Sequence, residues 1–116
     1  MRKIGILACN KANKVCAACS CLNAFNDKTF AFKAYENEDV ILGAFFRCSH
    51  CQDVSVEEDK DFQDKVERLK RENIEVMHVG VCMERTDSNG PSCKKVADMK
   101  RYLEDEGIKV VVGTHR

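Results

Sequence analysis

Four short apolar segments alternate with polar or amphipathic segments along the chain. They cover residues 3–8, 40–46, 74–81 and 108–112, and each predicts a β-strand. Residues 40–46 are continuously apolar, which is typical of a strand that is covered on both faces in a parallel sheet.

The segments between the strands predict three helices. In the first, Leu22 and Phe25 are three residues apart, as on one face of a short helix. In the other two, apolar residues recur every three or four positions on otherwise charged segments, as expected of amphipathic helices. These positions are Phe62, Val66 and Leu69 in the second helix, and Val96, Met99 and Leu103 in the third.

Local residues indicate where the later helices begin and end. Ser55 and Glu58 fit a capping box, with Ser55 as the N-cap of the second helix. Cys93 is expected to open the third helix, and Gly107 to follow its last turn as a C-cap.

The order of elements, β-α-β-α-β-α-β, predicts an α/β fold with a parallel sheet and helices on both faces. Because crossover connections are right-handed, few topologies remain. We expect a four-stranded doubly wound sheet in the flavodoxin-like order 2-1-3-4. With 116 residues and no linker, residues 1–116 are expected to form a single domain with its own core.

Charge and hydropathy exclude several classes of partner. Lysine plus arginine and aspartate plus glutamate number 19 each, so no electrostatic fit to nucleic acid or to a membrane surface is predicted. No apolar run is long enough to cross a membrane. The basic and then apolar residues 1–7 are too short in their apolar part for a signal peptide, and a cytoplasmic location is expected.

Eight cysteines are many for such a chain. In the cytoplasm, metal binding or thiol chemistry is favoured over a disulfide framework, although some thiols can be small buried hydrophobes. The Cys-x-x-Cys pair Cys48 and Cys51 stands between a strand and a helix. Thioredoxin-like motifs share that layout, so both the metal and the thiol–disulfide interpretations stay open.

The predicted strands end at Cys9, Cys48, Cys82 and His115. In a parallel sheet the carboxyl ends of the strands share one edge, and ligands bind outside that edge. Cysteines that merely pack in a core would instead be scattered along the strands. The sequence therefore predicts a thiol-rich site at the carboxyl edge.

The spacing of the strands limits which of these residues can bind the same metal ion. Neighbouring strands are about 4.8 Å apart, so the outer strand ends lie about 14 Å apart. Sulfurs around a tetrahedral ion, with metal–sulfur bonds of about 2.3 Å, are only about 4 Å from one another. One ion is therefore not expected to bind both Cys48 and His115. The predicted ligands are Cys9, Cys48, Cys51 and Cys82, with Cys16, Cys21, Cys93 and His115 as candidates for replacements or a second centre.

Zinc fits tetrahedral thiolate ligation, and an iron–sulfur cluster fits the same ligands. The alternative function is a thiol–disulfide oxidoreductase that uses Cys48 and Cys51. The hypothesis of a nucleotide- or flavin-binding module has less support, because residues 8–13 after the first strand lack a glycine-rich phosphate-binding loop. No catalytic base is evident, so enzymatic activity stays open.

Several other residues have structural interpretations. His78 lies in the middle of a predicted strand and is expected to be a hydrogen-bonded core histidine. Cys19 is expected only to pack or to be exposed. His50 is balanced between a ligand and a solvent-facing spacer. Phe30, Phe32 and Phe45 are expected in the core rather than in a cofactor cage.

With these residues in view, the chain resembles the CGGC-domain family of small prokaryotic proteins over almost its whole length. The matching motifs are Lys3-Ile4-Gly5-Ile6, the run from Cys16 to Leu22, Cys48 to Cys51, Cys82, Pro91-Ser92-Cys93 and Gly113-Thr114-His115. The resemblance implies a metal-binding domain, with zinc usually suggested and no established reaction.

The chain departs from the family pattern in two places. Ser49 and His50 replace the two central glycines, which places a possible ligand inside the motif. Lys94 and Lys95 follow Cys93 where family members often carry Pro-His, so this chain lacks the possible histidine ligand at that position.

Overall fold

The computed structural model describes residues 2–9, 17–48, 54–80 and 95–114. The strands of this part of the chain are β1 (Arg2–Ala8), β2 (Val40–Arg47), β3 (Val76–Val79) and β4 (Lys109–Val112). Its helices are α1 (Cys19–Asp27), the 3₁₀ helix η2 (Phe30–Tyr35), α2 (Lys60–Arg71) and α3 (Val96–Asp105).

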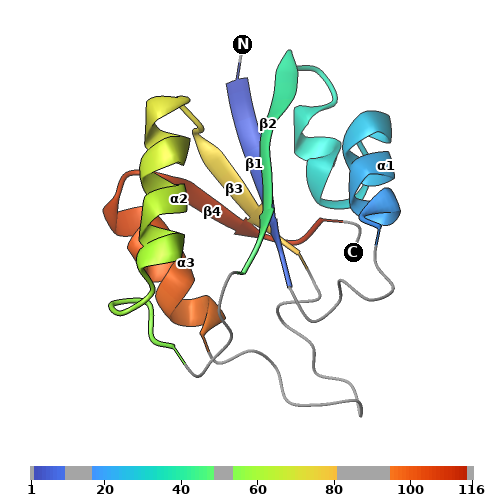
Figure 1. The fold of residues 1–116 in the computed structure, drawn as a ribbon. Coiled ribbons are helices and arrows are strands. Elements are labelled where there is room, and N and C mark those ends of the chain that lie inside the picture. The colour runs from blue at the N-terminus through green and yellow to red at the C-terminus, as the bar shows by residue number, and fades with distance from the viewer. Residues whose placement is uncertain (1, 10–16, 49–53, 81–94, 115–116) are drawn as a thin grey trace.

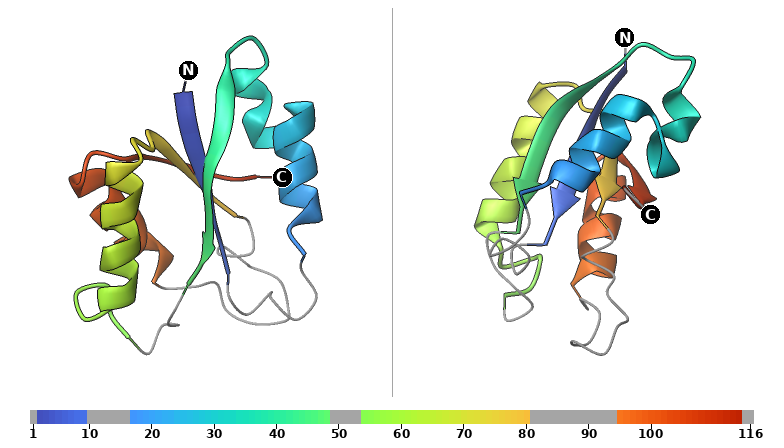
Figure 2. Two further views of the ribbon diagram at one scale, coloured as in Figure 1. Left: turned by 45° about the horizontal axis from the view of Figure 1, so that its top comes forward. Right: turned by 90° about the vertical axis from the view of Figure 1, so that its right-hand side faces the viewer.

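The four strands form one parallel sheet in the order β2-β1-β3-β4. Helices α2 and α3 cover one face of this sheet, and α1 with η2 covers the other (Figures 1 and 2). The α/β class, the strand order and the helices on both faces are therefore confirmed. Because the strands are parallel, their carboxyl ends lie at one edge of the sheet, which we call the carboxyl edge.

Two apolar clusters hold the helices to the sheet. Along β1, Leu7 packs on the side of α2 and α3, whereas Ile6 packs on the side of α1 and η2. This alternation follows from the two-residue period of a β-strand. The apolar helix positions predicted on α2 and α3 are all buried, which confirms them: Phe62, Val66, Leu69, Val96, Met99 and Leu103. The prediction that Phe30 lies in the core is wrong: it is 64% exposed, because η2 turns Phe32 and Tyr35, and not its first residue, toward the core.

The predicted capping box is wrong. Helix α2 begins at Lys60, and its N-cap is Asp59, whose Oδ1 accepts a hydrogen bond from the Phe62 backbone N–H at 3.0 Å. Ser55 lies in a preceding turn instead, where its carbonyl accepts from the Glu58 N–H at 3.1 Å.

A buried ion pair explains the choice of Asp59. Its Oδ2 lies 2.6 Å from Nζ of Lys95, and the two side chains are 2% and 4% exposed. Lys95 directly precedes α3, so the pair joins the starts of α2 and α3 beside the carboxyl edge.

Other boundaries differ slightly from the prediction. Strand β3 begins at Val76 rather than at residue 74, and α3 begins at Val96 within the described residues. Cys93, predicted to open that helix, lies outside them. Gly107 follows the end of α3 with φ of 87°, a left-handed conformation that favours glycine, as predicted.

Removal of one partner from the Asp59–Lys95 pair leaves a buried charge without its counter-ion. Such a change typically costs about 3–5 kcal/mol, and Asp59→Ala also removes a helix cap. We expect Asp59→Ala to lower the free energy of unfolding by at least about 3 kcal/mol in denaturant titrations. Asp64→Ala, an exposed position on α2, should change it by less than about 0.5 kcal/mol. Equal effects of the two variants would contradict a stabilising role of the pair.

Candidate metal site at the carboxyl edge

Cys9 and Cys48 directly follow the last paired residues of two neighbouring strands. Ala8 of β1 pairs with Arg47 of β2, and each cysteine is the next residue along its chain. Both cysteines therefore leave the sheet together at the carboxyl edge, as the sequence predicts.

A shift in strand register brings the two cysteines opposite one another. Ile4 pairs with Leu42, but Gly5 pairs with Ala44, so that Gly43 is an additional residue on β2. If the first register continued along the strands, Cys9 would lie opposite Arg47 instead. A β-bulge of one residue has this effect, because it moves every later residue of its strand by one position.

Glycine suits both positions at this irregularity. A Cβ atom on Gly43 would lie 2.9 Å from Cδ1 of Ile74, and one on Gly5 would lie 2.5 Å from Sδ of Met77. Both separations are shorter than ordinary packing allows, so a larger residue at either position would have to displace the end of the Met77 or the Ile74 side chain. Gly5 and Gly43 thus leave room for these two side chains beside the register change.

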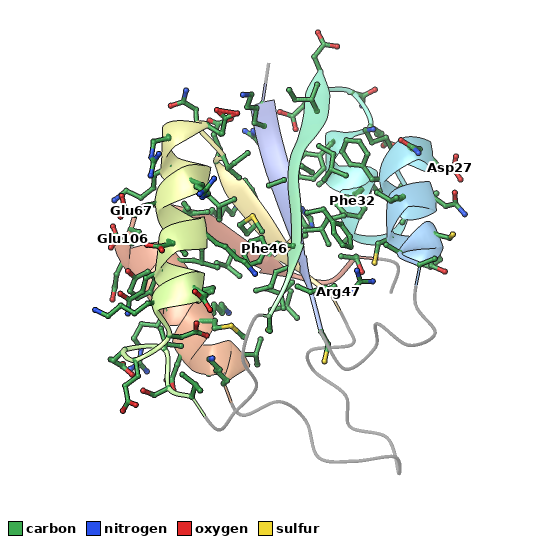
Figure 3. All side chains as sticks on the ribbon, viewed as in Figure 1. Asp27, Phe32, Phe46, Arg47, Glu67 and Glu106 are labelled. Carbon is green, nitrogen blue, oxygen red and sulfur yellow. The ribbon has the colours of Figure 1, made fainter. Side chains whose placement is uncertain are left out.

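Cys9 and Cys48 also share one face of the sheet. Both pack against the cluster that lies between the sheet and helices α2 and α3, as Leu7 and Phe46 do. Arg47 lies on the opposite side of β2 from Phe46 (Figure 3). Both cysteines are half-buried, and Sγ of Cys48 lies 4.0 Å from Sδ of Met99 on α3.

Positive groups surround this end of β2. Nζ of Lys65 on α2 donates a hydrogen bond to the Arg47 carbonyl at 2.9 Å and lies 5.3 Å from the centre of the Phe46 ring. Helices α2 and α3 both begin near this edge, and helix starts carry partial positive charge. The carboxylate of Asp59, which caps α2 and pairs with Lys95, lies at the same edge.

Strand β3 lies beside β1 on the side opposite to β2. Leu7 pairs with Val79, and the Gly80 N–H donates to the Leu7 carbonyl at 2.8 Å. The ends of β2, β1 and β3 are therefore adjacent, as the strand-order prediction requires. The remaining predicted or candidate residues lie outside the described part of the chain: Cys16, His50, Cys51, Cys82, Cys93 and His115.

Cys21 lies on the other face of the sheet. It is buried on α1, where its thiol donates to Oγ1 of Thr114 at 3.2 Å, and it packs in the cluster of α1 and η2. The sheet thus separates Cys21 from Cys9 and Cys48. Cys19, the first residue of α1, is exposed.

His78 is a satisfied core histidine, as predicted. It is fully buried, and its ring centre lies 4.4 Å from that of Phe32, which projects between the sheet and α1 (Figure 3). Nδ1 donates to the Gly113 carbonyl at 3.0 Å, because a carbonyl can only accept. Nε2 therefore accepts from the Tyr35 hydroxyl at 2.8 Å.

Three further observations concern the described part of the chain. Among residues 2–9, 17–48, 54–80 and 95–114, no group of three or more His, Cys, Asp or Glu side chains is arranged to hold a metal ion. A hollow of about 790 Å³ lies at the opposite, amino edge of the sheet, lined by residues such as Lys3, Ile41 and Lys109. No helix in the described ranges is long and apolar enough to cross a membrane.

Residues 3–115 match the CGGC domain. The chain is also 31% identical to the uncharacterized protein MJ0582 of Methanocaldococcus jannaschii over 122 aligned positions, covering 97% of this chain and 86% of that protein. No solved structure shows significant similarity.

The chain therefore belongs to the CGGC-domain family, as its motifs indicate. That domain is a cysteine-containing domain for which metal binding has been suggested. Of the four described cysteines, Cys9 and Cys48 are half-buried, follow neighbouring strand ends and pack on the same face of the sheet.

Burial lowers the pKa of His78, and the hydrogen bond to Gly113 opposes this effect only in part. The unfolded chain then takes up a proton below a pH of about 6.5, whereas the folded protein does so only at lower pH. Stability is therefore lost as the pH falls below about 6.5, by up to about 1.4 kcal/mol per pH unit.

Denaturant titrations of the wild type and His78→Gln between pH 7.5 and about 5 measure this contribution. We expect the wild type to show the steeper loss of unfolding free energy. Because both proteins retain His50 and His115, their difference isolates His78. Parallel pH profiles would contradict the proposed titration.

Proposed function

We propose that the protein binds a metal ion through thiolates at the carboxyl edge of its sheet. The predicted ligands are Cys9, Cys48, Cys51 and Cys82, and zinc is the favoured metal. The main support is the placement of Cys9 and Cys48, which follow the Ala8–Arg47 pair and pack on one face of the sheet.

The spacing of neighbouring strands suits this chemistry. In-register residues are about 4.8 Å apart, close to the separation of about 4 Å between sulfurs around one zinc ion. Small adjustments at the strand ends, beyond the last paired residues, are enough to bring two thiolates onto one ion.

The other two ligands are proposed from their positions in the sequence. Cys51 forms a C-x-x-C pair with Cys48, a spacing that is common in structural zinc sites. Cys82 follows Gly80 by two residues, and Gly80 is hydrogen-bonded beside Leu7, two residues before Cys9.

Cys21 fits a second centre better than this one, because the sheet lies between it and Cys9. Its partner Thr114 is followed in sequence by His115, which offers an imidazole for such a centre. Cys16 and Cys93 remain candidates for either centre.

Zinc is favoured because it takes tetrahedral sulfur ligation and holds thiolates without redox chemistry. Iron–sulfur clusters use the same ligands. In either case the ligands must stay reduced, which supports a cytoplasmic location.

We expect Cys9→Ser and Cys48→Ser each to weaken metal binding by at least about tenfold. Substitution of residues that only support metal ligands already lowers metal affinity by about that factor, so loss of a ligand should cost at least as much. Cys19→Ser is the matched control, because Cys19 is exposed on α1. The measurement is elemental analysis of protein purified without oxygen, followed by chelator competition.

The absorption spectrum of the same samples separates the alternatives. Colourless protein with one zinc per chain agrees with the proposal, whereas broad visible absorption with iron indicates a cluster. Metal-free protein with a titratable Cys48–Cys51 disulfide would contradict metal binding and favour a thiol–disulfide oxidoreductase.

A further inference from the structure

We propose that Cys9 and Cys48 form a cross-strand disulfide when the protein meets a peroxide, and that this bond switches off the metal site. Formation of the disulfide depends on the positions of Cys9 and Cys48 and not on a bound metal. Its effect on the metal rests on the proposed function above. The two parts are therefore tested separately.

The geometry of β1 and β2 carries the first part. The Cα atoms of in-register residues on neighbouring strands are about 4.8 Å apart, within the range of about 4.4–6.8 Å found for disulfides. Cys9 and Cys48 pack against the same cluster, so both side chains leave the sheet on the same side.

Closing the disulfide requires little movement. With parallel Cα–Cβ bonds, the Cβ atoms start about 4.8 Å apart and must approach by less than about 1 Å. The two cysteines lie beyond the Ala8–Arg47 pair, the last of the β1–β2 ladder. They can therefore approach without loss of any paired position.

Accessibility and position together distinguish this pair from the other described thiols. Cys9 and Cys48 are half-buried, so a small oxidant reaches them while neighbouring side chains hold their positions. Cys21 is buried at 5% exposure with its thiol on Thr114, and Cys19 is exposed on α1, which covers the other face of the sheet. Oxidation should therefore join Cys9 to Cys48 in preference to these two.

The reaction is a two-electron oxidation by hydrogen peroxide. One thiol attacks a peroxide oxygen, so that an S–O bond forms, the O–O bond breaks and one water leaves. The second thiol attacks the resulting sulfenic sulfur, so that the S–S bond forms, the S–O bond breaks and a second water leaves. In sum, two thiols and one peroxide give one disulfide and two waters.

Once joined, the two sulfurs no longer provide thiolate ligands. A site built on Cys9, Cys48, Cys51 and Cys82 would lose two of its four ligands in one step. Reduction by a dithiol would restore them. The carboxyl edge would thus release metal under peroxide and recover it after reduction.

The Cys51→Ser variant provides a direct test of the disulfide. After metal removal and peroxide treatment, trypsin digestion without reductant should yield residues 4–11 joined to residues 48–60. In this variant each of the two peptides contains a single cysteine, so their linkage identifies Cys9 and Cys48. Dithiothreitol should separate the peptides, and Cys19→Ser in the same background should leave the linkage unchanged.

If Cys51→Ser does not fold, the wild type serves, with fragmentation of the joined peptides to distinguish Cys48 from Cys51. Peroxide-treated protein in which Cys9 remains a thiol, or is joined to any cysteine other than Cys48, would overturn the proposal.

Metal release during oxidation of the loaded wild type tests the second part. We expect the released metal to rise in step with the Cys9–Cys48 linkage. Full linkage with the metal retained would overturn the switch. A linkage in protein whose reduced form binds no metal would refute the proposed function and leave the disulfide intact, so the two failures are distinguishable.

Discussion

The parallel pairing of β1 with β2 is the constraint on which the candidate site depends. It fixes the positions at which both chains leave the sheet, and so places Cys9 beside Cys48. The additional residue Gly43 is essential to that placement, because an uninterrupted register would put Cys9 opposite Arg47. A one-residue slip in a strand exchanges the two faces of the sheet. The register near Gly43 therefore decides whether two thiols meet or are separated.

The sequence predicted the fold well because its signals are local and repeated. The periodic positions of Phe62, Val66 and Leu69 indicated α2, and alternation of strands and helices indicated the parallel sheet. The error at the start of α2 has a long-range cause. Asp59 is fixed by Lys95, 36 residues away, and two charged residues in charged segments gave no sign of being partners.

The site was predictable only in part. The predicted strand ends were enough to place Cys9 and Cys48 at one edge. Their common face depends on the bulge, which could not be predicted because the residues on both sides of Gly43 are apolar and give no alternating pattern. Cys21 shows the opposite case. It was a candidate ligand at the same edge, yet α1 packs on the other face of the sheet and places its thiol beside Thr114.

X-ray absorption at the metal edge tests most directly whether Cys9 and Cys48 bind the same ion. The account predicts metal–sulfur distances of about 2.3 Å in the wild type. It also predicts one sulfur fewer around the metal in Cys9→Ser and in Cys48→Ser, with no change in Cys19→Ser. A metal that stays bound in Cys9→Ser with its full set of sulfur neighbours would contradict it.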